Sequence, residues 1–218
     1  MKNLLFFGVC LVAVKSSAQD FVYIHDVIPQ VEYDIRYFST NNFMGVRVDG
    51  YKKPIAMLSR EAALALKKVQ NDLDKQGYGL KIFDAYRPQK GVNHFIRWAL
   101  VTKDTVTKSL YYPDLDKSVL FDLGYIAERS GHTRGSTLDL TIVYKDTKKE
   151  VDMGSPWDFF GDISHHGTTK ISDGQTSNRR ILQKVMLENG FKQYDNEWWH
   201  YTLINEPYPD TYFDFDVK

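Results

Sequence analysis

Two separate segments of the chain carry side chains that could hold a metal ion. Residues 130–139 read Ser-Gly-His-Thr-Arg-Gly-Ser-Thr-Leu-Asp and supply His132 and Asp139, while residues 197–200 read Glu-Trp-Trp-His and supply His200. Imidazole and carboxylate ligands suit Zn²⁺, and a third ligand would leave a fourth position open for water, as in catalytic zinc sites. On the alternative interpretation, His132 is an ordinary loop residue and Asp139 is a capping group. The two tryptophans of 197–200 would then belong to the core.

Glu197 and Arg87 are candidates for the chemistry itself. A glutamate just outside a metal shell can act as general base and then as general acid. Arg87 follows a predicted strand and precedes a predicted helix, within Asp-Ala-Tyr-Arg-Pro at 84–88. Its fixed charge could stabilise an oxyanion in a cleft. The alternative is a surface ion pair between Arg87 and Asp84 or another acid.

Other histidines are weaker candidates. His165 and His166 are adjacent in the chain, and adjacent side chains point in different directions on a regular backbone. We therefore do not expect them to bind one ion together. His25 and His94 are isolated, and we expect them to be structural.

Hydrophobic periodicity predicts the elements that position these residues. Helices are expected at 59–77, where Ser59 is a suitable N-cap, after Pro88, and at about 177–189. Strands are expected in the first part of 21–37 and at 79–85, 138–144, 191–194 and 199–203, with irregular segments at 103–128 and 145–175. Helices outside a mostly antiparallel sheet predict an α+β fold. The metal site would lie at a cleft of the sheet.

Composition narrows the class of protein. The chain has 218 residues with 43% hydrophobic and 26% charged residues, which predicts one soluble globular domain. The formal net charge of +0 gives no reason to expect nucleic acid as a partner. Cys10 is the only cysteine, so a mature chain without it has neither a disulfide nor a thiol nucleophile. Any metal ligands must then be His, Asp or Glu.

Residues 1–18 have the pattern of a secretory signal. Lys2 is followed by an apolar run at 4–14, and small residues at 16–18 precede an expected cleavage after Ala18. The run is shorter than the roughly 20 residues that span a membrane. Alternatives are a buried N-terminal element or a lipid anchor on Cys10. The pattern predicts a domain at 19–218 that is periplasmic or secreted, or cytoplasmic if the signal is not processed.

Together the motifs resemble a known family. Tyr-Arg-Pro at 86–88, Ser-x-His-x-x-Gly-x-x-x-Asp at 130–139 and Glu-Trp-Trp-His at 197–200 occur in the order seen in the zinc D-alanyl-D-alanine dipeptidases of vancomycin resistance and their relatives, in peptidase family M15. The resemblance covers almost the whole mature chain. Further similar segments are 49–51, 76–79, 111–113, 164–166, 178–180, 206–209 and 212–215.

The resemblance implies a role for each candidate residue. One Zn²⁺ per chain would be bound by His132, Asp139 and His200. Glu197 would be the catalytic base and acid, and Arg87 would stabilise the transition state. The expected reaction is hydrolysis of D-Ala-D-Ala in cell-wall peptide turnover or glycopeptide resistance.

The same resemblance assigns the two substrate ends less directly. Ser130 would lie near the carboxylate of a small D,D-dipeptide, and Asp158 could pair with its free amino group. Thr137 departs from the pattern, because relatives often have Ala there. Alternatives are a D,D- or L,D-carboxypeptidase that trims peptidoglycan stem peptides, and a non-catalytic zinc-containing binding module. The sequence predicts no oligomeric state.

Overall fold

The computed structural model describes residues 20–218, and these residues contain two sheets. The predicted signal at 1–18 lies outside this part of the chain. In the main sheet the strand order is β2 (Glu32–Tyr33), β4 (Tyr78–Asp84), β5 (Thr137–Tyr144), β7 (Glu197–Leu203) and β6 (Phe191–Tyr194). The second sheet is the antiparallel pair β1 (Phe21–Tyr23) and β3 (Met57–Ser59).

The expected α+β fold is confirmed, and the main sheet is mixed. Strands β4, β5, β7 and β6 are joined by antiparallel pairs, whereas β2 pairs with β4 in parallel. A parallel pair needs a long crossover connection. Here the chain between β2 and β4 includes β3 and a helix, which gives it enough length to return in the same direction.

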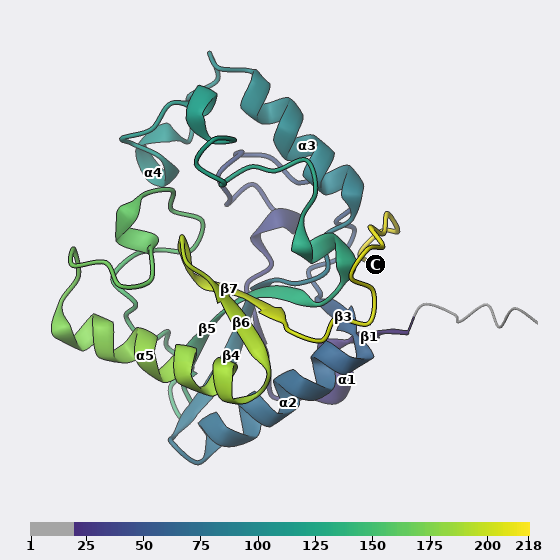
Figure 1. The fold of residues 1–218 in the computed structure, drawn as a ribbon, viewed down its shortest axis with the longest axis vertical. Coiled ribbons are helices and arrows are strands. Elements are labelled where there is room, and N and C mark those ends of the chain that lie inside the picture. The colour runs from purple at the N-terminus through teal and green to yellow at the C-terminus, as the bar shows by residue number, and fades with distance from the viewer. Residues whose placement is uncertain (1–19) are drawn as a thin grey trace, which may run out of the picture.

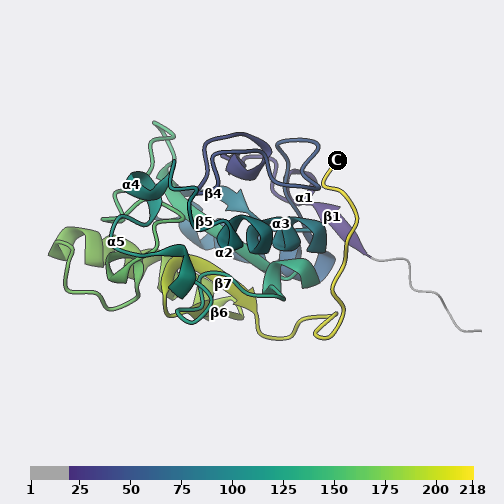
Figure 2. The ribbon, with the colours of Figure 1, turned by 90° about the horizontal axis from the view of Figure 1, so that it is seen from above.

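Helices lie on both sides of the main sheet. Helices α2 (Arg60–Asp74) and α5 (Asp173–Glu188) pack against each other and against β4 and β6. Helix α3 (Gln89–Leu100) lies on the other side, and the view from above places it in front of the sheet (Figures 1 and 2). The remaining helices are short: α1 (Ile24–Val27) and α4 (Lys108–Tyr111). No helix within residues 20–218 is both long enough and apolar enough to cross a membrane.

Several expected elements differ in the structure, including the helix expected at 59–77, which ends at Asp74. Helix α5 begins at Asp173 rather than near Ser177, because Ser172 and Gln175 form a capping box that adds one turn. The segment 21–37 is more structured than a strand followed by a loop, since it contains β1, α1, β2 and a 3₁₀ helix at Arg36–Phe38. The prediction that Ser59 is the N-cap of α2 is confirmed, because its hydroxyl accepts a hydrogen bond from the Ala62 amide.

Strand β5 lies at the centre of the main sheet. Seven of its eight residues are buried, so both of its faces are covered. Successive side chains of a strand point to opposite faces. Leu138 and Leu140 therefore face away from Asp139, which pairs with Asp84 of β4 on one side and His200 of β7 on the other. The sheet register thus brings polar residues of three strands together.

The segment after α3 is tied to the end of that helix. Lys117 is buried, and its Nζ donates hydrogen bonds to the carbonyl oxygens of Trp98 and Val101. The same ammonium group lies 3.8 Å from the centroid of the Trp98 ring. Charged donors at a helix C-terminus satisfy carbonyls that have no partner within the helix. Lys117 therefore fixes the start of a segment whose far end reaches the candidate site.

Candidate metal centre and active site

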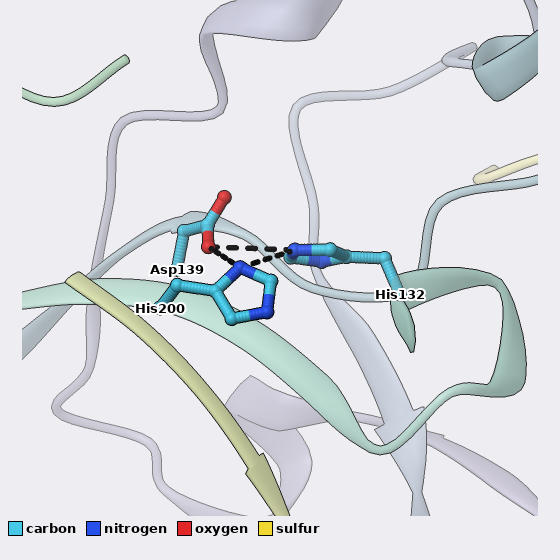
Figure 3. Close-up of side chains that lie close together, drawn as sticks. All are labelled: His132, Asp139 and His200. Carbon is cyan, nitrogen blue, oxygen red and sulfur yellow. Dashed lines mark hydrogen bonds and ion pairs between the residues drawn. The ribbon is translucent and has the colours of Figure 1, made fainter. Parts of the chain in front are cut away.

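The three predicted metal ligands converge on one point. His132 comes from the 3₁₀ helix Gly131–Arg134, Asp139 from β5 and His200 from β7 (Figure 3). Asp139 Oδ1 is 3.1 Å from His200 Nδ1 and 3.4 Å from His132 Nε2, and the two nitrogens are 3.3 Å apart. Within residues 20–218 this is the one group of three or more potential ligands that could share an ion.

The residues present fit a divalent metal ion of the zinc type. Bonds of about 2.0–2.1 Å in a tetrahedral shell place neighbouring ligand atoms about 3.3 Å apart, which matches the spacings here. Asp139 Oδ1 is buried and accepts no hydrogen bond of normal geometry from residues 20–218. His132 Nδ1 lies 2.7 Å from the Ala85 carbonyl oxygen, so it carries the ring proton and leaves the lone pair of Nε2 free for a metal.

The local charges also favour a cation. Burial lowers the pKa of His200, but the nearby carboxylates of Asp139 and Glu197 outweigh it and raise this pKa to about 9. Burial raises the pKa of Asp139, but His132 and His200 together hold it well below its usual range. The two carboxylates therefore stabilise positive charge between them, and a metal ion would replace the proton on His200.

Glu197 lies beside the cluster, at the start of β7. Its Oε2 is 3.3 Å from His200 Nδ1, and its side chain is mostly buried. The sequence predicted that this strand begins at Trp199, but it begins at Glu197. The pairing of β6 with β7 shifts register at Tyr194, opposite Glu197. Such irregularities redirect side chains, and this one allows Glu197 and His200 to reach the same site from positions three residues apart.

Arg87 reaches the site from the connection between β4 and α3. Its Nη2 lies 2.9 Å from Asp84 Oδ2 and 3.8 Å from Asp139 Oδ2. The ion pair with Asp84 that was the alternative interpretation is therefore present. It is buried and not on the surface, since Arg87 is 9% and Asp84 1% exposed. The pair does not exclude a role for the guanidinium in the site.

A pocket of about 270 Å³ encloses the cluster. This volume is at the lower end of the usual range for ligand sites. Every predicted site residue lines it: Arg87, Ser130, His132, Asp139, Asp158, Glu197 and His200. These residues come from distant parts of the chain, so the fold places the whole predicted set around one small space.

Asp158 is the most unusual residue of the pocket wall. It is 4% exposed and has a left-handed backbone conformation, with φ of 62°. The Tyr37 hydroxyl donates a hydrogen bond of 2.8 Å to its Oδ2. Burial raises the pKa of this carboxyl well above its usual value, and the nearby Asp139 adds to the effect. No ion pair joins Asp158 to a cation in residues 20–218, so it can receive a positive group from a ligand.

Ser130 holds the start of the ligand segment. Its hydroxyl accepts a hydrogen bond from the His132 amide, 3.3 Å away, and so caps the 3₁₀ helix. Gly135 ends this helix with φ of 80°, and a Cβ there would lie 2.3 Å from the Phe21 ring. The bend at this position requires glycine, which alone has both the conformational freedom and the small size.

The structure accommodates the unusual Thr137 through its neighbours. The Thr137 hydroxyl is buried, 2.9 Å from the Thr202 hydroxyl. A Cβ added to Gly131 would lie 2.5 Å from Thr137 Oγ1. The glycine beside His132 therefore provides the space that the larger side chain occupies.

Several residues of the pocket wall could not be recognised from the sequence. These include Tyr37, Tyr125, Arg129 and Tyr194. The aromatic residues gave no signal, because they come from separate segments without a common spacing. The position of Arg129 next to Ser130 was the only clue available for it.

The histidines considered weak candidates do not join the cluster. His165 Nε2 is 3.0 Å from the Tyr125 hydroxyl, and His166 packs against Tyr201. His25 is exposed beside Asp26. His94 lies near Asp49, with its Nδ1 3.4 Å from Oδ1.

A metal cluster with a free position, beside a glutamate that is not needed as a ligand, is typical of single-metal peptidases. Comparison with known proteins identifies the group more closely. The sequence model of the peptidase M15 family, described as D-ala-D-ala dipeptidase, matches residues 17–218. The chain belongs to this family of peptidases.

Individual relatives agree with the family match. The chain is 44% identical to a D-alanyl-D-alanine dipeptidase of Enterococcus faecalis and 42% identical to one of Enterococcus faecium. It is 39% identical to a D-alanyl-D-alanine dipeptidase of Streptomyces coelicolor. Each comparison spans 91% of this chain and 98% of the relative. The likeness therefore covers the fold and the whole pocket.

Proposed function

We propose that this protein hydrolyses the dipeptide D-alanyl-D-alanine to two D-alanines, using one zinc ion per chain. The observation that carries the proposal is the composition of the pocket. It combines three potential metal ligands, a nearby glutamate and a buried arginine in about 270 Å³. The substrate is inferred from the relatives, which are D-alanyl-D-alanine dipeptidases.

Each side chain has a defined task in this reaction. His132, Asp139 and His200 would hold the zinc ion, which would act as a Lewis acid toward the peptide carbonyl and the attacking water. Glu197 accepts the proton of the attacking water and delivers it to the leaving amine. The Arg87 guanidinium stabilises the negative charge that develops on the carbonyl oxygen.

The pocket also offers one ionisable group for each end of a free dipeptide, and a substrate ammonium group beside Asp158 would favour the charged form of that carboxyl. Asp158 is buried and pairs with no cation in residues 20–218, so it suits the substrate ammonium group. Ser130 and the exposed Arg129 lie on the same pocket wall and suit the carboxylate. Arg129 has no acidic partner within the described chain, and its guanidinium lies over the Tyr212 ring, 5.0 Å from the centroid.

This arrangement favours a dipeptidase over a carboxypeptidase. In a stem peptide the amino group of the penultimate alanine is acylated, so it has no charge to pair with Asp158. The rest of the peptide would also have to pass a buried carboxylate. Both effects oppose the binding of an N-terminally extended substrate.

Purified protein loaded with zinc tests the proposal. We expect cleavage of D-Ala-D-Ala, little cleavage of L-Ala-L-Ala or of a stem pentapeptide ending in D-Ala-D-Ala, and loss of activity with chelator. Preferred cleavage of the pentapeptide would establish the carboxypeptidase instead. Zinc binding without cleavage of any of these peptides would favour the binding module.

We also propose that the protein is exported. An exported enzyme would meet dipeptides that are released during cell-wall turnover, so its role would be to recycle them. The signal pattern at 1–18 supports this. Fractionation of cells and N-terminal sequencing test it. A cytoplasmic protein that retains residues 1–18 would contradict export.

A further inference from the structure

Asp84 is buried at the end of β4 and contacts Arg87, a residue of the pocket, and the buried Tyr51. It is 1% exposed and does not line the pocket. Its Oδ2 accepts from Arg87 Nε at 3.0 Å and lies 2.9 Å from Arg87 Nη2. Its Oδ1 accepts from the Tyr51 hydroxyl at 2.6 Å. Both carboxylate oxygens of Asp84 therefore have a hydrogen-bond donor: Oδ1 has Tyr51, and Oδ2 has Arg87.

The guanidinium of Arg87 is restrained from other directions as well. Its carbon lies 5.1 Å from the centroid of the Tyr37 ring and 4.8 Å from that of Phe95. Aromatic rings limit where a planar cation can move but not how it rotates in its own plane. The contacts of Nε and Nη2 with one carboxylate oxygen remove that freedom. Asp84 thus decides which edge of the guanidinium is left for the pocket.

We propose that Asp84 is the positioning residue for Arg87, and that Tyr51 holds Asp84 in place. The inference rests on the proposed function, since it requires that Arg87 acts on the reacting carbonyl. Asp84 itself touches no substrate. Its effect is to present Arg87 in a ready orientation, so that no reorganisation is needed when negative charge develops.

A rival role for Asp84 would be to orient the metal ligand His132. Asp84 Oδ2 lies 3.5 Å from His132 Nδ1. The Ala85 carbonyl oxygen is closer to the same nitrogen, at 2.7 Å. His132 therefore has its hydrogen-bond acceptor without Asp84, and the geometry points to Arg87 as the group that depends on this carboxylate.

A double-mutant cycle with zinc-loaded protein tests the proposal, using Asp84→Asn, Arg87→Ala and the combination. Loss of an oxyanion donor costs about 10²–10³-fold in kcat, so we expect Arg87→Ala in this range and Asp84→Asn to lose at least about 10-fold. KM and zinc affinity should change little in Asp84→Asn. In the Arg87→Ala background, Asp84→Asn should lower kcat by no more than about two-fold.

Two further variants keep the test sharp. Tyr51→Phe removes the hydroxyl that donates to Asp84 but does not alter charge. It should lower kcat by a smaller factor than Asp84→Asn does. This variant keeps the proposal testable if Asp84→Asn folds poorly. Asp34→Asn is the matched control, because Asp34 pairs with Arg36 at 2.8 Å outside the pocket lining. Its kcat should equal that of the unmodified protein.

The outcomes separate this proposal from the proposed function. If the unmodified protein does not cleave D-Ala-D-Ala, the proposed function fails. If it does, but Asp84→Asn keeps its kcat or loses the same factor in both backgrounds, Asp84 does not act through Arg87. A loss that disappears at saturating zinc would assign Asp84 to His132 and overturn the proposal.

Discussion

The ring nitrogens of His132 and His200 lie 3.3 Å apart, although the two residues are 68 positions apart in the chain. With Asp139 they form a preformed cluster whose carboxylate oxygen lacks a hydrogen-bond donor. Metal binding to the folded state should therefore stabilise the protein. At a free zinc concentration of 100 times Kd, the gain is about 2.7 kcal/mol.

Titration of metal-free protein with zinc should give one ion per chain and a raised melting temperature. Asp139→Asn should lose most of this shift, because a neutral amide is a poor ligand for zinc. A stoichiometry of two, or an unchanged shift in Asp139→Asn, would contradict the assigned ligands.

Replacing Glu197 should separate catalysis from metal binding. Glu197 lies next to His200 but is not needed to complete the cluster. Loss of a general acid–base residue typically costs about 10²–10⁴-fold in rate. Glu197→Gln should therefore lose kcat in this range while binding zinc as before. A variant that retains kcat within a few-fold would remove Glu197 from the mechanism.

Arg129 should discriminate between free and blocked carboxylates. A hydrogen bond between charged groups is worth about 1.5–3 kcal/mol, so Arg129→Ala should raise KM for D-Ala-D-Ala by about 10- to 100-fold. For the C-terminal amide of the dipeptide, KM should be similar in both proteins. Arg129→Lys keeps the charge and should recover part of the affinity. Equal effects of Arg129→Ala on acid and amide would disprove the contact.

Gly131 and Thr137 should behave as a compensating pair. Gly131→Ala forces a new Cβ to within 2.5 Å of Thr137 Oγ1, and overpacking of this kind costs about 1–3 kcal/mol. Thr137→Ala removes the obstacle but also the contact with Thr202. The double variant should therefore lose less stability than the sum of the single variants, as measured by denaturant unfolding. Additive losses would show that the two positions are independent.

His166 should make stability depend on pH. Burial, assisted by the charge of Arg179, lowers its pKa to about 4. In the unfolded chain this histidine has an ordinary pKa near 6.5. Between pH 6.5 and pH 4 it is therefore protonated in the unfolded chain but neutral in the folded chain. The contribution of His166 to stability is therefore full above pH 6.5 and falls as the pH is lowered toward 4, by about 3 kcal/mol.

The neutral variant His166→Gln isolates this contribution from those of other groups. The difference in unfolding free energy between the two proteins should change between pH 7 and pH 4. A constant difference across this range would show that His166 titrates normally in the folded protein.

The candidate metal ligands, Glu197 and Arg87 could be proposed from the sequence because they lie in short motifs whose order resembles that of a known family. The structure places all of them around one pocket. Hydrophobic periodicity predicted the helices and strands beside them. An element that buries one face has apolar residues at the spacing of a helix or of a strand, and this spacing can be seen in the sequence. Ser59 marked the start of α2 for a similar reason: the hydrogen bond of an N-cap depends on nearby residues alone.

The tertiary structure decided which distant residues meet. The sheet register places Asp139 between Asp84 and His200, and no local pattern encodes which strands become neighbours. The same is true of Asp158 and Tyr37, which meet across 121 positions. Asp84 looked like a surface partner of Arg87 because burial is a property of the assembled core. Only the folded chain shows that their ion pair lies inside, where it can orient an arginine toward the pocket.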